Sequence, residues 1–589
     1  MNRVMTENAP IQEKTVWRWS LLWVTGLFLL AMRPIEAFDT FWQLQAGKYI
    51  WQTGAFLYRD TFSLAADAYR MEHCWLHDLI LYGLYSTGGY FLLSLLKPVL
   101  IALCGGLLLR WAQQRGGNPL VVLPVLTLCL IGSSDSWLVR PQLWTFLLSI
   151  LILVFLYRGR ERGWRSWLWL PPLMLLWANL HAACIFGFAL IGAFWVGECW
   201  RAWRGSSSWR TLGQLSVCGV LTFAAAFVNP YGYRIPLGEL LAHFNQLQVL
   251  TGNAPVGMAG NMEWLPPTFA QVPWFYLIMA LWGATLLSRL WRRQLEVAEL
   301  VYFAGFSYMG FSQIRHTTLV ALLAGFFLPL AIQELLTGRE RTRTWLARPV
   351  PWHWLPGLML LAALVWGAAG AGRLGLGVRA DQYPVAAADF VATNRPAANL
   401  YNAYDWGGYL MWRLYPDYLV FIDGRSTSPR HFAASDILDN GWEGWRALLD
   451  EYGINTIVTR TCFYDSGGPL PLIDGLVQDR DWSLVFQDGV AVVFVRNDAA
   501  SRELRSRFAI PSRQAYQTML EEAGRLQEEG YERPRTWLAL GWAAFNLGDG
   551  RRALDAYRHF LGIVPTNLEA QSRIALLQRL YPGGEEAGR

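Results

Sequence analysis

Polar and ionisable side chains gather in the segments that separate the long apolar runs of this chain. Three carboxylates, Asp39, Asp60 and Asp78, follow the first apolar run. The other members of the group are Asp135, Arg140, Asn179, His181, Tyr231, Arg234, Arg315 and His316. Ionisable groups near membrane depth are costly and usually face a protein interior or an aqueous cavity. Because a carboxylate can accept a proton and arginine can hold a developing negative charge, these residue types predict a site.

The sequence contains no phosphate-binding P-loop, Rossmann fingerprint, HExxH or GxSxG motif. Its seven cysteines form neither a CxxC pair nor a cysteine–histidine spacing of the kind that binds zinc. The sequence therefore predicts no particular cofactor. A divalent metal ion stays open, although no acidic cluster that would hold one is visible.

The composition indicates a membrane protein. Hydrophobic residues make up 53% of the chain and charged residues only 16%, against roughly 25% in soluble domains. The 32 tryptophans fit this class, because their rings favour the boundary between water and lipid. The net charge of +6 does not indicate nucleic acid as a partner, since the basic residues lie mostly in short loops between apolar runs.

Apolar runs long enough to cross a bilayer predict a polytopic α-helical membrane protein with about eleven transmembrane helices. The predicted spans are 17–33, 90–109, 119–133, 142–157, 166–178, 183–200, 211–228, 273–288, 296–313, 317–335 and 352–371. The first span is predicted to be a signal anchor, because Arg33-Pro34-Ile35-Glu36 at its end is not a small-residue cleavage site. The transmembrane module is thus assigned to residues 17–371.

The distribution of arginine predicts the orientation of these spans, because cytoplasmic loops carry the excess of positive charge. Alternate short loops contain Arg110 and Arg115; Arg158, Arg160, Arg162 and Arg165; Arg201, Arg204 and Arg210; Arg289, Arg292 and Arg293; and Arg339, Arg341, Arg343 and Arg348. The intervening short turns contain only Arg140 and Arg315. The tail 1–16 is therefore predicted to be cytoplasmic, and the loops 34–89 and 229–272 and the C-terminal region extracytoplasmic. Apolar residues at helical spacing within 237–247 predict an interfacial helix.

The pattern after residue 372 becomes that of a soluble α/β domain, which we assign to 372–500. Short apolar segments predict strands at 399–402, 418–423, 455–459, 483–487 and 491–496. Helical segments are predicted near 384–394, 406–414, 428–452 and 468–479. This alternation predicts a mainly parallel sheet that ends in a hairpin.

The last segment, 501–589, is predicted to be a short all-α tail with one tetratricopeptide repeat at 534–567. Trp537, Leu540, Gly541, Ala553, Tyr557 and Pro565 occupy the offsets of this helix pair. A single repeat cannot bury its own hydrophobic face, so it must pack on flanking helices near 512–529 and 568–580, on the α/β domain or on a partner protein.

The first outer loop resembles that of GT-C glycosyltransferases. The matching residues are Asp39-x-x-Trp42-x-Leu44-x-x-Gly47, Thr53-Gly54, Asp60-x-Phe62-Ser63 and Trp75-Leu76-x-Asp78. The pattern is most similar to the bacterial branch that includes protein-mannosyltransferase-like and aminoarabinose-transferase-like enzymes. Further elements resemble uncharacterised bacterial members: Arg140-Pro141-Gln142, Trp177-Ala178-Asn179-Leu180-His181, Asn229-Pro230-Tyr231-Gly232, Arg315-His316, and the run from Tyr401-Asn402 through Trp406-Gly407-Gly408-Tyr409 to Asp423-Gly424-Arg425. The resemblance covers about residues 15–500. The combination of such a membrane module with a tetratricopeptide repeat also resembles the eukaryotic transmembrane O-mannosyltransferases.

The resemblance implies a hexosyl- or pentosyltransferase of the bacterial cytoplasmic membrane, active on its outer face. Such an enzyme moves a sugar with inversion from a polyprenyl-phosphate donor to a hydroxyl of a lipid, glycan or protein. Asp39 matches the acidic position of the family's first loop and is the expected catalytic base. Arg140, Arg315 and His316 are the expected phosphate-side residues; further donor or acceptor contacts are expected from His181, Asn179, Asp135, Asp60, Asp78, Tyr231 and Arg234. The sequence departs from the mannosyltransferases, which often have an Asp-Glu pair where Asp39 is followed by Thr40.

Other interpretations stay open at this point. Asp39 could only cap the helix that follows, Arg140 and Arg315 could be interface anchors, and Asp423-Gly424-Arg425 could be a strand-end turn. Asp60 and Asp78 could organise the loop rather than do chemistry. At the level of function, the alternatives are an O-antigen ligase or polymerase and a non-catalytic assembly factor that recruits partners through its repeat. A transporter would favour paired inverted repeats with broken helices, which the sequence does not show.

Overall fold

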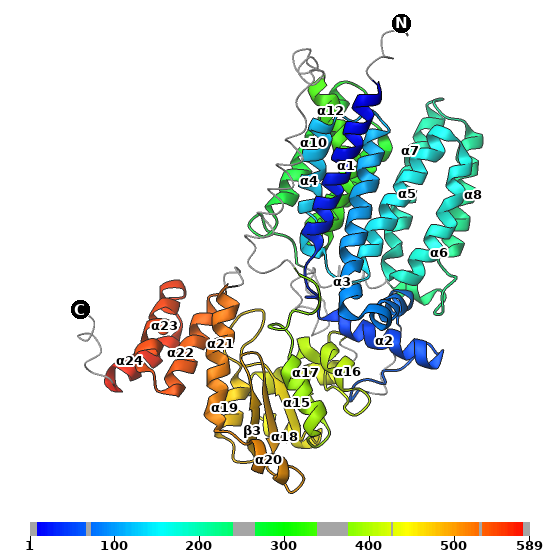
Figure 1. Cartoon of the computed structure of the whole chain (residues 1–589). Helices are drawn as coiled ribbons and strands as arrows, with labels where there is room; N and C mark the ends of the chain where they lie inside the picture. Colours follow the sequence, from blue (N-terminus) through cyan, green and yellow to red (C-terminus); the bar gives the residue numbers. More distant parts are fainter. Residues whose placement is uncertain are drawn as a thin grey trace. The chain divides into compact units, whose positions relative to one another are not determined.

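The computed structural model describes residues 9–65, 72–238, 265–337, 375–425, 428–528 and 533–580 (Figure 1). The chain divides into two compact units, which we treat separately. The helical unit comprises Met1–Ala37, Ala46–Phe56 and Glu72–Val378, and the C-terminal unit comprises Phe38–Gln45, Leu57–Met71 and Arg379–Arg589. Two pieces of the predicted first outer loop, including the one that carries Asp39, therefore cluster with the C-terminal region of the chain.

The helical unit is built from apolar helices that coincide with the predicted spans. They are α1 (Ala9–Ala31), α3 (Trp75–Gln113), α4 (Pro119–Ile131), α5 (Gln142–Arg162), α6 (Leu170–Leu180), α7 (Ile185–Trp203), α8 (Trp209–Ala225), α10 (Pro273–Trp291), α11 (Val297–Ser312) and α12 (Ile314–Thr337). The eleventh predicted span, 352–371, and most of the predicted interfacial helix in 237–247 lie outside the described residues.

Four helical segments of the described chain are long and apolar enough to cross a membrane: Trp75–Gln113, Gln142–Arg162, Ala182–Trp203 and Ile314–Thr337. They make the chain a multi-pass membrane protein, as the composition predicts. The count of eleven spans and their orientation stay predictions. Helix α3 has 39 residues and would extend about 58 Å if straight, far beyond a bilayer core of about 30 Å. Non-helical backbone at Gly88 and Gly89 divides it just before the predicted span 90–109.

Ion pairs that include the buried carboxylates of Glu198 and Glu299 link helices of this unit. Arg160 of α5 lies 2.6 Å from Glu198 of α7, whose side chain is 2% exposed. Arg289 of α10 pairs with Glu299 of α11 and, at 2.7 Å, with Glu334 of α12. A buried charge is tolerated only with a partner, so these pairs restrict how the helices can pack.

The sheet of the C-terminal unit contains β1 (Leu400–Asn402), β2 (Thr456–Thr459), β3 (Trp482–Gln487) and β4 (Val492–Arg496) in the order β1-β2-β4-β3. Only β1 and β2 are parallel; β4 is antiparallel to both of its neighbours. The prediction of a final hairpin is confirmed, and the prediction of a mainly parallel sheet is wrong. The helices of this part are α15 (Val385–Asn394), α16 (Gly407–Leu414), α17 (Pro429–Asp439), α18 (Trp445–Glu451) and α19 (Pro471–Gln478).

The predicted strand 418–423 is not a strand of this sheet. Its backbone pairs instead with the first outer loop. The Val420 amide donates a hydrogen bond to the Phe62 carbonyl, and the Val420 carbonyl accepts one from the Leu64 amide, which forms a parallel bridge at Ser63. On its other side, the side chain of Asn402 accepts a hydrogen bond from the Phe421 amide at 2.8 Å and donates one to the Ile422 carbonyl at 2.8 Å. The side chain of Asn402 thus makes the hydrogen bonds to this segment that a neighbouring strand would make in the predicted sheet.

The last helices are α20 (Arg502–Phe508), α21 (Ala515–Glu528), α22 (Arg535–Leu547), α23 (Gly550–Ile563) and α24 (Leu568–Leu580). Tyr516 and Met519 of α21 and Leu540 of α22 belong to the same buried cluster as Leu484 and Phe494 of the sheet. Helices α21 and α22 are therefore part of the α/β core. A Cβ at Gly541 would lie 2.7 Å from the Tyr557 ring, so α22 and α23 approach closely at a small residue. The assignment of this pair as a tetratricopeptide repeat stays a prediction.

Candidate functional site

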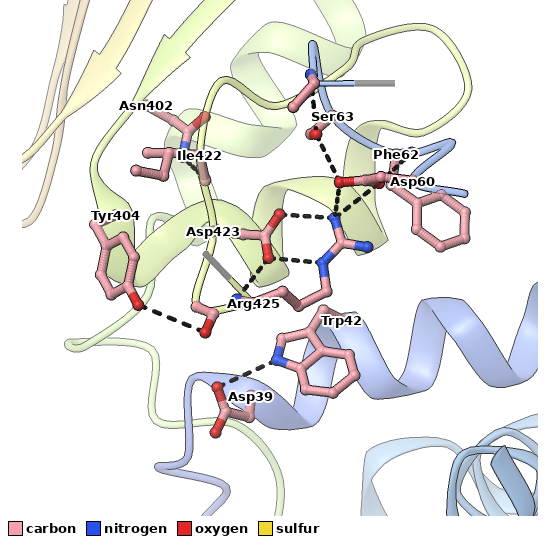
Figure 2. Close-up of polar contacts among 12 residues, drawn as sticks. Asp39, Trp42, Asp60, Phe62, Ser63, Asn402, Tyr404, Ile422, Asp423 and Arg425 are labelled. Atoms are coloured by element: carbon pink, nitrogen blue, oxygen red, sulfur yellow. Dashed lines mark hydrogen bonds and ion pairs between the residues drawn. The ribbon is translucent and has the colours of Figure 1, made fainter. Parts of the chain in front are cut away.

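Asp39 begins helix α2 (Asp39–Thr53), whose first turn belongs to the C-terminal unit. A carboxylate in the first turn is favoured by the partial positive charge of the helix N-terminus. Its Oδ1 also accepts a hydrogen bond from Nε1 of Trp42, one turn later, at 3.1 Å (Figure 2). The side chain is partly exposed, so its carboxylate is oriented but not sealed from solvent.

Two glycines of the C-terminal unit let the first turn of α2 approach closely. A Cβ at Gly424 would lie 2.9 Å from Oδ1 of Asp39. A Cβ at Gly408 would lie 3.0 Å from the Phe38 carbonyl oxygen and 3.2 Å from the Trp42 amide nitrogen. Both distances are shorter than normal contacts of a Cβ, so a side chain at either position would displace this turn or its carboxylate.

Aromatic packing holds the same turn from another direction. The ring of Phe41 is fully buried and lies edge-on to Tyr383 and to Tyr409, with centroid distances of 4.8 Å in both cases. Phe38 packs on Tyr383 and Tyr464 in the same manner. The position of Asp39 is thus determined by residues that lie more than 300 positions later in the sequence.

Asp60 forms a buried ion cluster with Arg425 and Asp423 (Figure 2). The Nη2 of Arg425 lies 3.1 Å from Oδ1 of Asp60, and its Nε and Nη2 each lie 2.7 Å from an oxygen of Asp423. The three side chains are at most 2% exposed. Asp60 also accepts hydrogen bonds from the Phe62 amide at 3.0 Å and the Ser63 hydroxyl at 2.7 Å. These contacts support the interpretation that Asp60 organises the loop.

A second charged network begins at Asp405, which follows β1. Arg460 lies 3.7 Å from Asp405 and 4.0 Å from Glu522 of α21, and its guanidinium stands over the rings of Trp406 and Tyr464. Burial raises the pKa of the Asp405 carboxyl, and Arg460 opposes this shift while the carboxylates of Asp465 and Asp39 add to it. Asp405 and Asp39 are therefore close enough to interact electrostatically.

The helical unit places several other candidates in hydrogen-bonded positions. Asn179 accepts from Nε1 of Trp75 at 2.9 Å and donates to the Val228 carbonyl at 2.9 Å. Nδ1 of His181 is 2.7 Å from the Thr145 hydroxyl. Burial lowers the pKa of His181 well below its ordinary value, and electrostatic interactions with His73, His77 and Arg315 lower it further. These four side chains form one neighbourhood, in which His181 is neutral at physiological pH.

The remaining candidates of this unit differ in exposure. The hydroxyl of Tyr231 accepts a hydrogen bond from the Glu72 amide at 3.1 Å, and His316 is buried with its ring edge-on to Phe186. Asp78 is buried in the first turn of α3, where a Cβ at Gly47 would lie 2.0 Å from its carbonyl oxygen. Asp135, Arg234 and Arg315 are exposed, and Arg140 is partly exposed just before α5.

Asp39 and Asp60 thus lie in the C-terminal unit, and the other nine predicted site residues lie in the helical unit. The sequence identified both acidic residues but did not predict the engagement of Arg425 and Gly424 with them. The only sign of this contact in the sequence is the run Asp423-Gly424-Arg425, which belongs to the family resemblance. In the part of the chain that the structure describes, no group of three or more His, Cys, Asp or Glu side chains is arranged to hold a metal ion.

No protein-family model and no curated protein matches the chain. Solved structures do. The archaeal oligosaccharyltransferase AglB from Archaeoglobus fulgidus, in complex with an inhibitory peptide and a dolichol-phosphate, gives a TM-score of 0.54 at 11% identity over 76% of this chain and 70% of that chain. The oligosaccharyltransferase of the same organism in the apo form gives 0.51 at 12% identity over 84% and 75%. ArnT from Cupriavidus metallidurans bound to undecaprenyl phosphate gives 0.42 at 14% identity over 84% and 99%, a likeness too distant to support an argument. The first two structures show that this chain shares the fold of the archaeal oligosaccharyltransferase.

Proposed function

We propose that this protein transfers a sugar, with inversion, from a polyprenyl-phosphate donor to an acceptor hydroxyl of a lipid, glycan or protein. The observation that carries the proposal is the placement of Asp39 within the GT-C fold. Its carboxylate is oriented by Trp42 at 3.1 Å, and a Cβ at Gly424, in a turn whose other two side chains are buried, would lie 2.9 Å from it. If Asp39 only capped α2, the close approach of its carboxylate to Gly424, hundreds of positions later in the sequence, would have no purpose.

In this proposal Asp39 accepts the proton of the acceptor hydroxyl. The acceptor oxygen then forms a bond to the anomeric carbon, and the bond from that carbon to the phosphate oxygen breaks. Its electron pair leaves with the polyprenyl phosphate, so the reaction needs no other reagent. General base catalysis of this type contributes on the order of 10²–10⁴ in rate.

The leaving phosphate requires positive charge or hydrogen-bond donors. We assign this role to Arg315, His316 and Arg140, with His181 as a neutral neighbour. Arg315 lowers the pKa of His181, which supports the placement of these two residues close to each other. In the solved AglB structure the bound lipid is a dolichol-phosphate, which is a ligand of the chemical class that we propose here.

We further propose that the protein lies in the bacterial cytoplasmic membrane with its N-terminus inside and its C-terminal unit outside. The arginine-rich loops support this orientation. A cysteine introduced at the exposed Ala433 of α17 should react with an impermeant maleimide in intact cells. Labelling that requires permeabilised cells would reverse the orientation.

The proposed activity is tested with purified protein in liposomes that contain a radiolabelled polyprenyl-phosphate sugar. We expect label to move to a hydroxyl acceptor and the new linkage to have the opposite anomeric configuration, measured by NMR. Transfer of a preassembled glycan from a lipid diphosphate would instead favour a ligase or polymerase. Stable association with a second protein, without consumption of any lipid-linked donor, would favour an assembly factor.

A further inference from the structure

The turn Asp423-Gly424-Arg425 is held rigidly by its own side chains. The carboxylate of Asp423 accepts a hydrogen bond from the Arg425 amide at 2.9 Å, which closes a turn of the backbone. The same carboxylate receives the guanidinium of Arg425 through Nε and Nη2, both at 2.7 Å. This two-point ion pair fixes the direction of the Arg425 side chain as well as its charge.

The turn is also fastened to the first outer loop. Nη2 of Arg425 reaches Asp60, and the guanidinium carbon lies 5.5 Å from the centre of the Phe62 ring. On the other side, the Tyr404 hydroxyl donates a long hydrogen bond of 3.5 Å to the Gly424 carbonyl (Figure 2). Because every group of this cluster is buried or anchored, the turn cannot shift without breaking several of these contacts.

Gly424 is the point at which this rigid turn meets Asp39. Its φ is not in the left-handed region, so the backbone itself would accept alanine. Space is the limit, since a Cβ would lie 2.9 Å from Oδ1 of Asp39, the one atom within 4 Å of it among the described residues outside Asp423 and Arg425. The atom that must give way is the end of a side chain, and the carboxylate would move while the fold remains.

We infer that Gly424 is a positioning residue for the carboxylate of Asp39. The inference rests on the proposed function, in which Asp39 is the base. The turn limits the space on one side of the carboxylate, and the Trp42 N–H donates a hydrogen bond to Oδ1. Together they direct the carboxylate toward the acceptor hydroxyl.

The test is Gly424→Ala, compared with Gly489→Ala as a matched control. At Gly489 a Cβ would lie 2.7 Å from Oε2 of the exposed Glu521, so this variant displaces the carboxylate of Glu521 rather than that of Asp39. Both variants should fold with a thermal midpoint close to wild type. We expect Gly424→Ala to lower kcat roughly 10- to 100-fold with little change in KM for the donor, because small misplacements of a reacting group are costly. Gly489→Ala should retain wild-type turnover.

A double-mutant cycle separates positioning from general damage to the site. If Gly424 acts only through Asp39, adding Gly424→Ala to Asp39→Asn should cause no further loss of activity. Losses that multiply would overturn the inference, as would a Gly424→Ala enzyme with normal kcat beside an inactive Asp39→Asn enzyme. An Asp39→Asn enzyme with normal activity would overturn the proposed base and this inference together, so the two failures are distinguishable.

Discussion

Nη2 of Arg425 lies 3.1 Å from a carboxylate oxygen of Asp60, although 365 positions separate the two residues in the sequence. Both side chains are at most 1% exposed. This ion pair joins the first outer loop to the turn that contacts Asp39. The C-terminal unit thus contributes to the candidate site, because its Arg425 holds the segment of the loop that contains Asp60.

Removing Arg425 should strongly destabilise the C-terminal unit. Arg425→Ala would leave Asp60 and Asp423 buried without their partner, a change that typically costs about 3–5 kcal/mol. Arg425→Lys should restore part of the stability, since lysine keeps the charge but loses the planar fork. Arg430→Ala is the control, because its pair with Glu451 is exposed and should contribute at most about 1 kcal/mol. Thermal unfolding of the full chain in detergent measures all three, and equal midpoints would contradict the structural role.

The C-terminal unit should become less stable as pH rises through neutrality. Burial raises the pKa of the Asp439 carboxyl to about 7, although the Tyr401 hydroxyl donates to it at 2.6 Å and opposes the shift. The folded state therefore binds a proton that the unfolded state releases near pH 4. Between these two values the native state holds more protons, so stability falls with increasing pH and the contribution is lost above about pH 7.

Asp439→Asn should flatten this dependence, because the amide stays neutral at every pH. Hydrogen exchange of the β2 amides, measured in the full chain between pH 5 and pH 8 after correction for the intrinsic rate, reports the local stability. Asp555→Asn on the exposed face of α23 is the control. A slope that is the same in wild type and Asp439→Asn would argue against a protonated Asp439.

The length of a C-terminal truncation should decide whether the protein folds. Deleting 500–589 removes α21, whose Glu522 accepts hydrogen bonds from the Thr461 and Cys462 amides at 2.8 and 3.1 Å and whose Met519 is in the sheet core. This deletion should unfold the α/β domain. Deleting only 568–589 leaves that core intact, since the buried residues of α24, Ala570 and Leu577, belong to the separate cluster with α22 and α23.

Because α24 packs on α22 and α23, the shorter deletion also tests whether the surface that these last helices form together presents the acceptor. We expect turnover on a simple soluble acceptor to persist, while transfer to the physiological acceptor falls. Equal loss of both activities would assign the last helices a structural role only. Protease sensitivity of the α/β domain, measured alongside, shows whether the core has been preserved.

Arg315 should matter for use of the donor lipid. Arg315→Ala should weaken donor use more than Arg315→Lys, since lysine keeps the positive charge but cannot form a planar two-point contact with phosphate. The measurement is the dependence of initial rate on donor concentration. If both variants match wild type, Arg315 is an interface anchor.

The apolar periodicity of the sequence predicted most elements, but not how distant segments pair. Ten predicted spans fall on helices because each apolar run carries its own signal. The short apolar segment 418–423 predicts a strand of the sheet, and this prediction is wrong because Asn402 and the loop 62–64 take its backbone hydrogen bonds. Nothing within 418–423 reveals those partners.

The same limit applies to the candidate site. The residue type and the position of Asp39 after the first apolar run made it recognisable. The need for glycine at 424 depends on a contact between segments separated by hundreds of residues, so it could be found only from the tertiary structure.

The last prediction concerns Asp39 itself. Asp39→Asn keeps the size of the side chain and its ability to accept from Trp42 and to cap α2, since Asn and Asp cap helices comparably. It removes the negative charge that the helix N-terminus favours, a small effect on stability, and the capacity to take a proton. If Asp39 is the base, the rate of sugar transfer should fall by a factor on the order of 10²–10⁴, whereas protein level and thermal midpoint should barely change. Asp39→Ala, compared at matched protein amounts with a radiolabelled polyprenyl-phosphate donor, should be at least as slow. A role limited to capping would leave Asp39→Asn active and impair only Asp39→Ala. Near-normal transfer by Asp39→Asn would falsify the assignment and direct attention to the carboxylates of Asp78 and Asp135, because Asp60 is already committed to Arg425.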